Sequence, residues 1–155
     1  MIITIDPSGT STTGIFCFWN WDKYEIISFS HEKWTKHVDF LVGLIDKHQP
    51  EYIAYENSNF LKGAVMNHHF RNLLKVVAGI EWICYEKGIK SKWIGSVFVE
   101  KINQNWGKKN KVGGLVYNNK KWSFKGQVLN EHEKDAILVF YLFYKSVLKN
   151  DWPFC

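Results

Sequence analysis

Three acidic residues in this chain stand where carboxylates are unexpected. Asp6 ends the apolar run that starts at Ile2, and Glu56 ends a second apolar run. Asp135 lies inside a third run and is followed directly by Ala136. Acidic side chains are rarely buried unless they are paired or bound to a metal. Three converging carboxylates would repel one another, and a hard divalent cation such as Mg²⁺ is the usual counter-charge.

A site of this kind suits the hydrolysis of a phosphodiester. Two metal ions roughly 4 Å apart can activate a water molecule and stabilise the leaving oxygen. Each acid also has a structural interpretation: Asp6 can cap the turn that follows it, Glu56 can end its strand in solvent, and Asp135 can pair with a lysine. Because each acid follows or interrupts an apolar run, we favour a shared metal site.

The chain must contain a framework that brings positions 6, 56 and 135 together. Its apolar patterns predict these elements in order: strands 1–6, 14–19 and 23–30, helix 33–48, strand 51–56, helix 64–87, strand 89–94, helix 97–106 and helix 131–149. An antiparallel meander followed by alternating helices and strands predicts an α/β fold. Its core would be a five-stranded mixed sheet flanked by helices.

Length, composition and net charge limit the classes of protein to which this chain can belong. A chain of 155 residues predicts a single domain over 1–155. The three cysteines form no C-x-x-C pair, so they predict neither a zinc site nor a disulfide framework. No signal peptide or membrane-spanning run is evident, and we expect a cytoplasmic protein with no membrane partner. The net charge of +5 is compatible with a polyanionic partner.

Basic residues are concentrated in one segment, residues 107–128, which we interpret as a loop or insertion. No Asp or Glu occurs between Lys101 and Asn130, and aromatic residues alternate with the lysines. This pattern favours a surface that follows a phosphate backbone. Within it, residues 116–124 read as a hairpin around Asn118-Asn119.

The acidic motifs resemble those of the RuvC-type Holliday junction resolvases, which have an RNase H-like fold. The segment from Ile2 to Gly14, with Asp6-Pro7 and then small residues, is similar to the opening of that family. Residues 52–56 are similar to its second acidic strand, and residues 132–136 to its C-terminal pattern, in which an acid or His precedes Asp-Ala by three residues. The resemblance covers nearly the whole chain. The loop after Asp6 and the 107–128 segment are longer than in typical members.

The resemblance implies an endonuclease that acts as a homodimer, nicks opposite strands of a four-way DNA junction and uses Mg²⁺ or Mn²⁺, with two ions in each site. Asp6, Glu56 and Asp135 would be metal ligands. His132, on the same helical face as Asp135, would ligate metal or assist the water. Glu131 is a minor candidate, whereas Glu133 is better explained as the capping-box partner of an N-cap Asn130.

The resemblance also implies contacts with DNA. Phe60, four residues after Glu56, stands where the family places an aromatic wedge against junction bases. Phosphate contacts are expected from nearby basic residues and from those after the third predicted helix: Lys62, Arg71, Lys108, Lys109 and Lys111.

Three other interpretations remain open. An RNase H-like nuclease could act on other branched DNA, on flaps or on RNA–DNA hybrids with the same carboxylates. The chain could instead be a DNA-binding module without catalysis. The acidic turn after the first strand also resembles that of actin-like ATPases, but those proteins need a second domain that this length does not accommodate. Dimerisation with a two-fold pair of nicks would favour the resolvase, which we expect to act on DNA in the cytoplasm, in a nucleoid or during viral replication.

Overall fold

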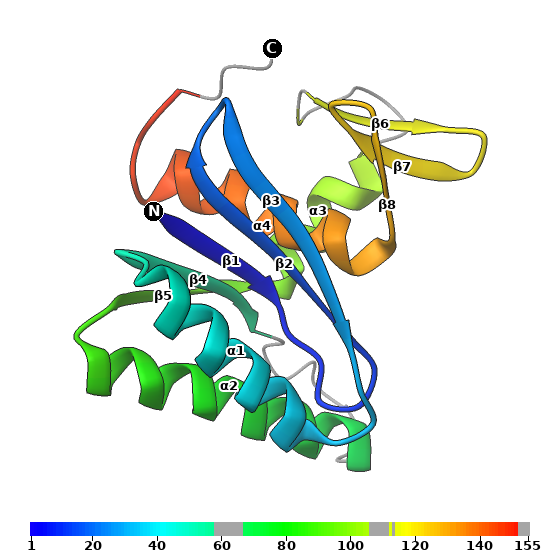
Figure 1. Ribbon diagram of the computed structural model, residues 1–155. Coiled ribbons are helices and arrows are strands. Elements are labelled where there is room, and N and C mark those ends of the chain that lie inside the picture. The colour runs from blue at the N-terminus through cyan, green and yellow to red at the C-terminus, as the bar shows by residue number, and fades with distance from the viewer. Residues whose placement is uncertain (58–66, 106–111, 113, 152–155) are drawn as a thin grey trace.

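The computed structural model describes residues 1–57, 67–105, 112 and 114–151 (Figure 1). Its elements in chain order are β1 (Ile2–Asp6), β2 (Thr12–Asn20), β3 (Lys23–Ser30), α1 (Trp34–His48), β4 (Tyr52–Asn57), α2 (His68–Lys87), β5 (Lys90–Gly95), α3 (Ser96–Asn105), β6 (Leu115–Asn118), β7 (Lys121–Phe124), β8 (Gln127–Leu129) and α4 (Glu131–Ser146).

The central feature is a five-stranded sheet in the order β3-β2-β1-β4-β5. Strands β1, β2 and β3 form an antiparallel meander, whereas β4 pairs with β1 and with β5 in parallel. The mixed sheet predicted from the sequence is therefore confirmed. Parallel pairing of β1 and β4 places the carboxyl ends of both strands at the same edge of the sheet.

Helices cover both faces of this sheet (Figure 1). Ile3 and Ile5 of β1 are buried in one apolar cluster with residues of α1 and α2. Ile2 lies in the other cluster, with residues of α4, and the hydroxyl of Thr4 donates to the Ala136 carbonyl of α4 at 2.8 Å. Because both faces are covered, β1 is apolar at successive positions and not at alternate ones.

Helix α4 is the principal cover of the second face. Its buried residues surround most of the helix: Lys134, Ala136, Ile137, Leu138, Val139, Phe140 and Phe143. A helix that is apolar nearly all round belongs in a core, and the sequence prediction of a buried helix holds, although the helix ends three residues before the predicted Lys149. No helix in the described part of the chain is long and apolar enough to cross a membrane.

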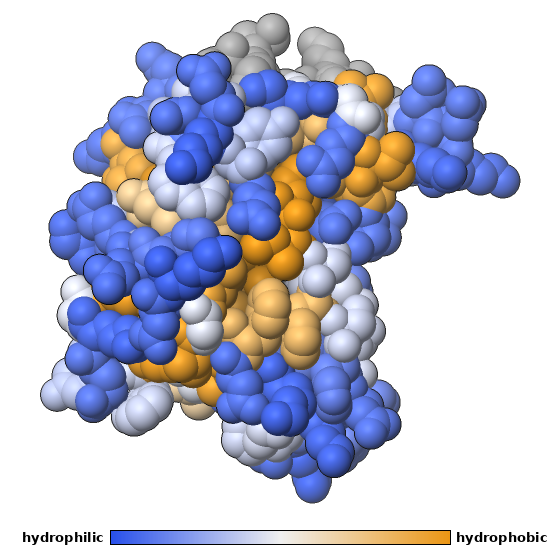
Figure 2. Space-filling view, viewed as in Figure 1, coloured by the Kyte–Doolittle hydropathy of each residue, from blue (hydrophilic) through white to orange (hydrophobic). Residues whose placement is uncertain are grey.

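Within the basic segment, the described residues form a second, three-stranded sheet, β6-β7-β8. The predicted hairpin is confirmed, but its turn lies one residue later than predicted, because Asn118 pairs with Lys121. The turn residues Asn119 and Lys120 both have positive φ, at 49° and 61°, as a tight two-residue turn requires. The third strand, β8, was not predicted. Leu115, Phe124 and Leu129 join this sheet to the α4 cluster, while its hydrophilic tip projects at the right of the molecule (Figures 1 and 2).

Candidate active site

Asp6 and Glu56 lie side by side at one edge of the sheet. Asp6 is the last residue of β1, and Glu56 follows Tyr55 in β4. The register pairs Ile5 with Tyr55, so the two acids come one position later on neighbouring parallel strands. The apolar runs that fix this register are buried on both faces, and a slip of one residue would turn every side chain to the wrong face.

The N-terminus of α4 brings the other two predicted residues to the same edge. Asn130 is the N-cap, its side chain accepts from the Glu133 amide, and the Glu133 carboxylate accepts from the Asn130 amide. The predicted capping box is therefore confirmed. Since Glu133 also accepts from the Ser28 hydroxyl at 2.6 Å, it orients the helix and is not a candidate ligand.

Gly14 of β2 permits this approach of α4 to the sheet. A Cβ atom at position 14 would lie 2.0 Å from the His132 carbonyl oxygen and 2.2 Å from its carbon. Only a residue without a side chain fits there. Gly14 thus determines how close His132 and Asp135 come to the acids of β1 and β4.

Two of the acids are already paired with basic side chains of the chain. His132 Nδ1 donates to Asp6 Oδ2 at 2.7 Å. Lys134 Nζ lies 3.1 Å from Asp135 Oδ1 and 2.6 Å from Glu131 Oε2. Glu131, the minor candidate, is thus engaged by Lys134 on the exposed side of the helix.

Burial and repulsion from neighbouring carboxylates raise the pKa of two of the acids, Asp6 and Glu56. Burial, with repulsion from Asp6, Asp135 and Glu100, raises the pKa of Glu56 to about 8. Burial also raises the pKa of Asp6, although its hydrogen bond with His132 opposes the shift. The same hydrogen bond raises the pKa of His132 and favours the imidazolium form. The cluster therefore concentrates negative charge that only a cation or a proton can neutralise.

The donor set suits a hard divalent cation, because it consists of carboxylate oxygens with one imidazole beside them. In the described part of the chain, no group of three or more His, Cys, Asp or Glu side chains is arranged to hold a metal ion as it stands. Asp6 is hydrogen-bonded to His132, and Asp135 is paired with Lys134. Metal binding would require these carboxylates to exchange a chain cation for the metal.

We expect Glu56→Gln to stabilise the metal-free protein. An ordinary Glu is ionised in the unfolded chain above pH 4.5, whereas the folded state retains the Glu56 proton up to a pKa of about 8. The unfolded state therefore binds fewer protons, and the contribution of Glu56 to stability falls as the pH rises from 4.5 to 8. Gln does not titrate, so its advantage should grow over that interval to about 1–3 kcal/mol, within the limit of about 1.4 kcal/mol per pKa unit.

Urea unfolding in EDTA at pH 5 and pH 8 measures this difference. Glu86→Gln, at an exposed position of α2, is the matched control and should change little at either pH. An equal stability of wild type and Glu56→Gln at pH 8 would show that Glu56 is not buried against other carboxylates.

The sequence did not identify Lys134 and Glu100 as members of this region. Glu100 of α3 adds to the repulsion on Glu56, and Lys134 bonds directly to Asp135. A signal for Lys134 was present, because this lysine lies in a helix that was predicted to be buried, close to the apolar run 136–140. The sequence does not show which carboxylate Lys134 pairs with, because three carboxylates lie within one helical turn of it.

The predicted DNA-binding residues lie mostly outside the described part of the chain; these are Phe60, Lys62, Lys108, Lys109 and Lys111. Arg71 is described, and it is exposed in the first turn of α2. That turn lies beside the loop after Asp6: Thr10 Oγ1 is 2.7 Å from His69 Nδ1, and a hollow beside this loop is lined by His69, Phe70 and His132, among others. The structure thus brings the start of α2 close to the candidate site.

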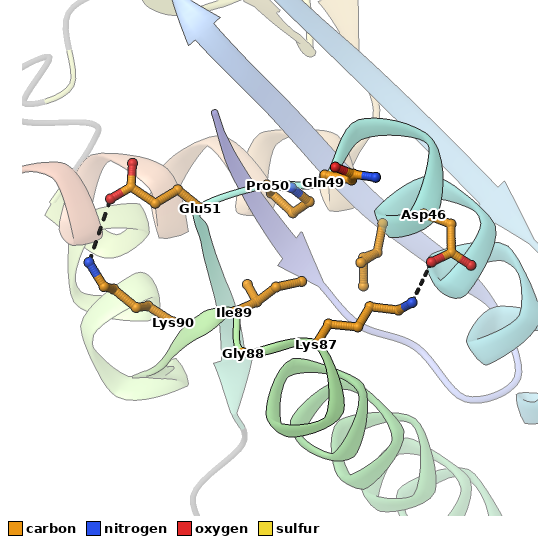
Figure 3. Close-up of a pocket in the computed structure, with 9 residues that line it drawn as sticks. Asp46, Gln49, Pro50, Glu51, Lys87, Gly88, Ile89 and Lys90 are labelled. Atoms are coloured by element: carbon orange, nitrogen blue, oxygen red, sulfur yellow. Dashed lines mark ion pairs between the residues drawn. The ribbon is translucent and has the colours of Figure 1, made fainter.

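A separate hollow lies at the opposite edge of the sheet, where α1 and α2 end and β4 and β5 begin (Figure 3). Its charged residues are paired with each other, Lys87 with Asp46 and Lys90 with Glu51. Within each pair the positive and negative charges cancel. The described residues that line this hollow include no cluster of buried acids like the one around Asp6. We therefore assign the candidate active site to the first edge.

The sheet order, the flanking helices and the acids at the carboxyl ends of β1 and β4 define an RNase H-like α/β protein. Solved structures of RuvC from Thermus thermophilus share this fold. One is RuvC of Thermus thermophilus in complex with a Holliday junction substrate, with 14% identity, 94% of each chain covered and a TM-score of 0.58. Another is a further structure of Thermus thermophilus RuvC, with 16% identity, coverage of 94% of this chain and 95% of that chain, and a TM-score of 0.59.

The likeness to RuvC that the sequence motifs indicated is thus confirmed for the fold. No protein-family model matches the sequence, and no match is found among curated proteins. At identities of 14% and 16%, the likeness to RuvC shows the fold.

Proposed function

We propose that this protein is a metal-dependent endonuclease that resolves four-way DNA junctions. The observation that supports the proposal is the convergence of Asp6, Glu56, His132 and Asp135 at one edge of a RuvC-like fold. Elements far apart in the sequence supply these residues, and burial together with repulsion from neighbouring carboxylates raises the pKa of Asp6 and of Glu56. Sites with strongly perturbed carboxylates are often sites of catalysis.

In this proposal, Asp6, Glu56 and Asp135 hold the metal, with His132 beside them. Mg²⁺ or Mn²⁺, when bound, supplies the positive charge that phosphodiester hydrolysis needs, and the sequence predicts two ions. Hydrolysis forms a bond between water oxygen and phosphorus and breaks the bond from phosphorus to the 3′-oxygen. His132 holds a proton at Nδ1 against Asp6 and orients that carboxylate.

The proposed substrate is branched DNA. Thermus thermophilus RuvC is bound to a Holliday junction substrate in one of the similar structures. Arg71 at the exposed start of α2 is well placed to meet a phosphate near the site, and the exposed lysines of the small sheet, Lys120, Lys121 and Lys125, extend the basic surface. Other branched forms, flaps and RNA–DNA hybrids would need the same carboxylates, so substrate choice has to be measured.

The test compares a labelled four-way junction with a linear duplex, a flap and an RNA–DNA hybrid, each with Mg²⁺, Mn²⁺ or EDTA. Paired, symmetric nicks in the junction alone, lost in EDTA, are the expected result. Metal-dependent cutting of one of the other nucleic acids, and not of the junction, would support a nuclease but exclude a junction resolvase. Tight junction binding without cutting under either metal would exclude catalysis and leave a DNA-binding module.

We also propose a homodimer in which α2 contacts a second copy. Trp82 and Tyr85 of α2 are 61% and 83% exposed, and aromatic residues are enriched in protein interfaces. We expect Trp82→Lys with Tyr85→Lys to convert the dimer to a monomer in sedimentation experiments and to replace paired nicks by single ones. Phe98→Lys, which changes an exposed aromatic residue of α3, is the control. A wild-type monomer at micromolar concentration would contradict this part of the proposal.

A further inference from the structure

Lys134 occupies an unusual position for a lysine. Its side chain is 5% exposed although the residue lies close to the N-terminus of α4. The ammonium is 3.1 Å from Asp135 Oδ1 and 2.6 Å from Glu131 Oε2. A buried lysine is costly unless its charge is compensated, and here Asp135 and Glu131 compensate it. The sequence motifs of the site assign no role to this residue.

The small sheet keeps this ammonium in place. The Trp122 ring of β7 lies over Lys134, with Nζ 5.4 Å from the ring centroid, which is within the range of a cation–π contact. The sheet is itself fastened to the rest of the protein: Lys125 Nζ donates to the Trp21 carbonyl oxygen at 2.9 Å, and Phe124 is fully buried. Trp122 therefore shields the ammonium from water on one side while carboxylates hold it on the other.

The position of Lys134 has a direct consequence for metal binding. Asp135 is a proposed metal ligand, and one of its oxygens is already occupied by a positive charge. An ammonium and a divalent cation compete for the same carboxylate, and the positive charge of Lys134 also repels a metal ion a few ångströms away. Lys134 thus reduces the negative charge that Asp6, Glu56 and Asp135 offer together.

We propose that Lys134, which is held in place by Trp122, is a built-in counter-ion of the candidate active site. Its ammonium competes with divalent metal for Asp135 and thereby lowers the metal affinity of the DNA-free protein. This inference depends on the metal site of the proposed function. It goes further by assigning a role to a residue that is not itself a ligand, and to the small sheet that covers it.

The experiment titrates Mn²⁺ into the DNA-free protein by calorimetry and compares wild type with Lys134→Met. Methionine keeps the unbranched apolar stem and removes the charge. We expect Mn²⁺ to bind about tenfold more tightly, or better, to Lys134→Met, because one positive charge near the metal is removed. The increase in melting temperature on adding Mn²⁺ should also be larger for Lys134→Met than for wild type.

Two control variants separate the effect of removing a charge at position 134 from other effects of the substitution. Lys87→Met removes one positive charge at the opposite edge of the sheet, where Lys87 pairs with Asp46 (Figure 3), and should leave the Mn²⁺ affinity unchanged. Lys134→Arg keeps a cation at the site and should not bind Mn²⁺ more tightly than wild type. If Lys134→Met does not unfold cooperatively, Lys134→Gln, which retains a hydrogen-bond donor, replaces it.

An unchanged or weaker Mn²⁺ affinity in a folded Lys134→Met or Lys134→Gln variant would overturn the inference. If wild type binds Mn²⁺ and cuts junctions while those variants show no tighter binding, the inference fails and the proposed function stands. If neither wild type nor the variants bind Mn²⁺, the metal site of the proposed function fails as well.

Discussion

Asp6→Asn is expected to reduce junction cleavage by roughly 10³-fold or more while leaving the fold and DNA binding intact. A bound metal supplies several kcal/mol of transition-state stabilisation, and about 1.4 kcal/mol corresponds to a tenfold change in rate. Asparagine keeps the shape of the side chain and an oxygen that can accept from His132 Nδ1, which is 2.7 Å away in the native protein. It removes the negative charge that a divalent ion requires.

Single-turnover cleavage of a labelled junction, with binding measured separately in Ca²⁺, checks this expectation. Asp39→Asn is the matched control, because Asp39 is an exposed aspartate of α1 that pairs only modestly with Lys36 at 3.2 Å, and its cleavage rate should equal that of wild type. Activity of Asp6→Asn within tenfold of wild type would place the catalytic metal elsewhere. Loss of cleavage together with loss of cooperative unfolding would point to a structural role of Asp6.

Gly14→Ala is expected to have the largest effect on stability, about 2–4 kcal/mol, as for other severe overpacking of a core. The added methyl group would lie 2.0 Å from the His132 carbonyl oxygen and 2.8 Å from the Glu133 nitrogen. Both are backbone atoms of the first turn of α4 and cannot rotate away. The helix must shift from β2, and His132 and Asp135 must shift with it.

This displacement should also weaken cleavage by about 100-fold, since a misplacement of roughly 1 Å at a catalytic group has effects of that size. Gly43→Ala is the control: a Cβ atom at position 43, an exposed position of helix α1, meets no atom within 4 Å, and the substitution should stabilise the protein by about 0.5–1 kcal/mol. Urea unfolding and junction cleavage measure both effects. Wild-type stability of Gly14→Ala would mean that α4 does not pack on β2 as described.

The sequence was sufficient to predict the elements that position the site. The apolar runs before Asp6 and Glu56 specify buried strands, and a site at their ends follows from parallel pairing. The N-terminus of α4 was equally predictable, because Asn130 and Glu133 form a capping box from local contacts alone. Such features depend on residues close together in the chain, which is why pattern and spacing reveal them.

Contacts between distant segments could not be predicted in the same way. The hydrogen bond of His132 with Asp6 joins positions 126 residues apart, and the contact of Trp122 with Lys134 depends on how the small sheet folds back over α4. Neither has a local pattern. The strand β8 was missed for a related reason, since its three residues are too few to show a period of two.

The dependence of the site on α4 has a consequence for the order of events during synthesis. β1, β2 and β4 are complete once residue 57 has been made, but the helix that covers their second face comes last, from residue 131 onward. Until then, Phe16 and Phe18 lack the partner ring of Phe140, whose centroid is 5.0 and 4.6 Å from theirs. A nascent chain therefore exposes these apolar rings and has no assembled carboxylate cluster, and the candidate site forms only when α4 packs onto the sheet.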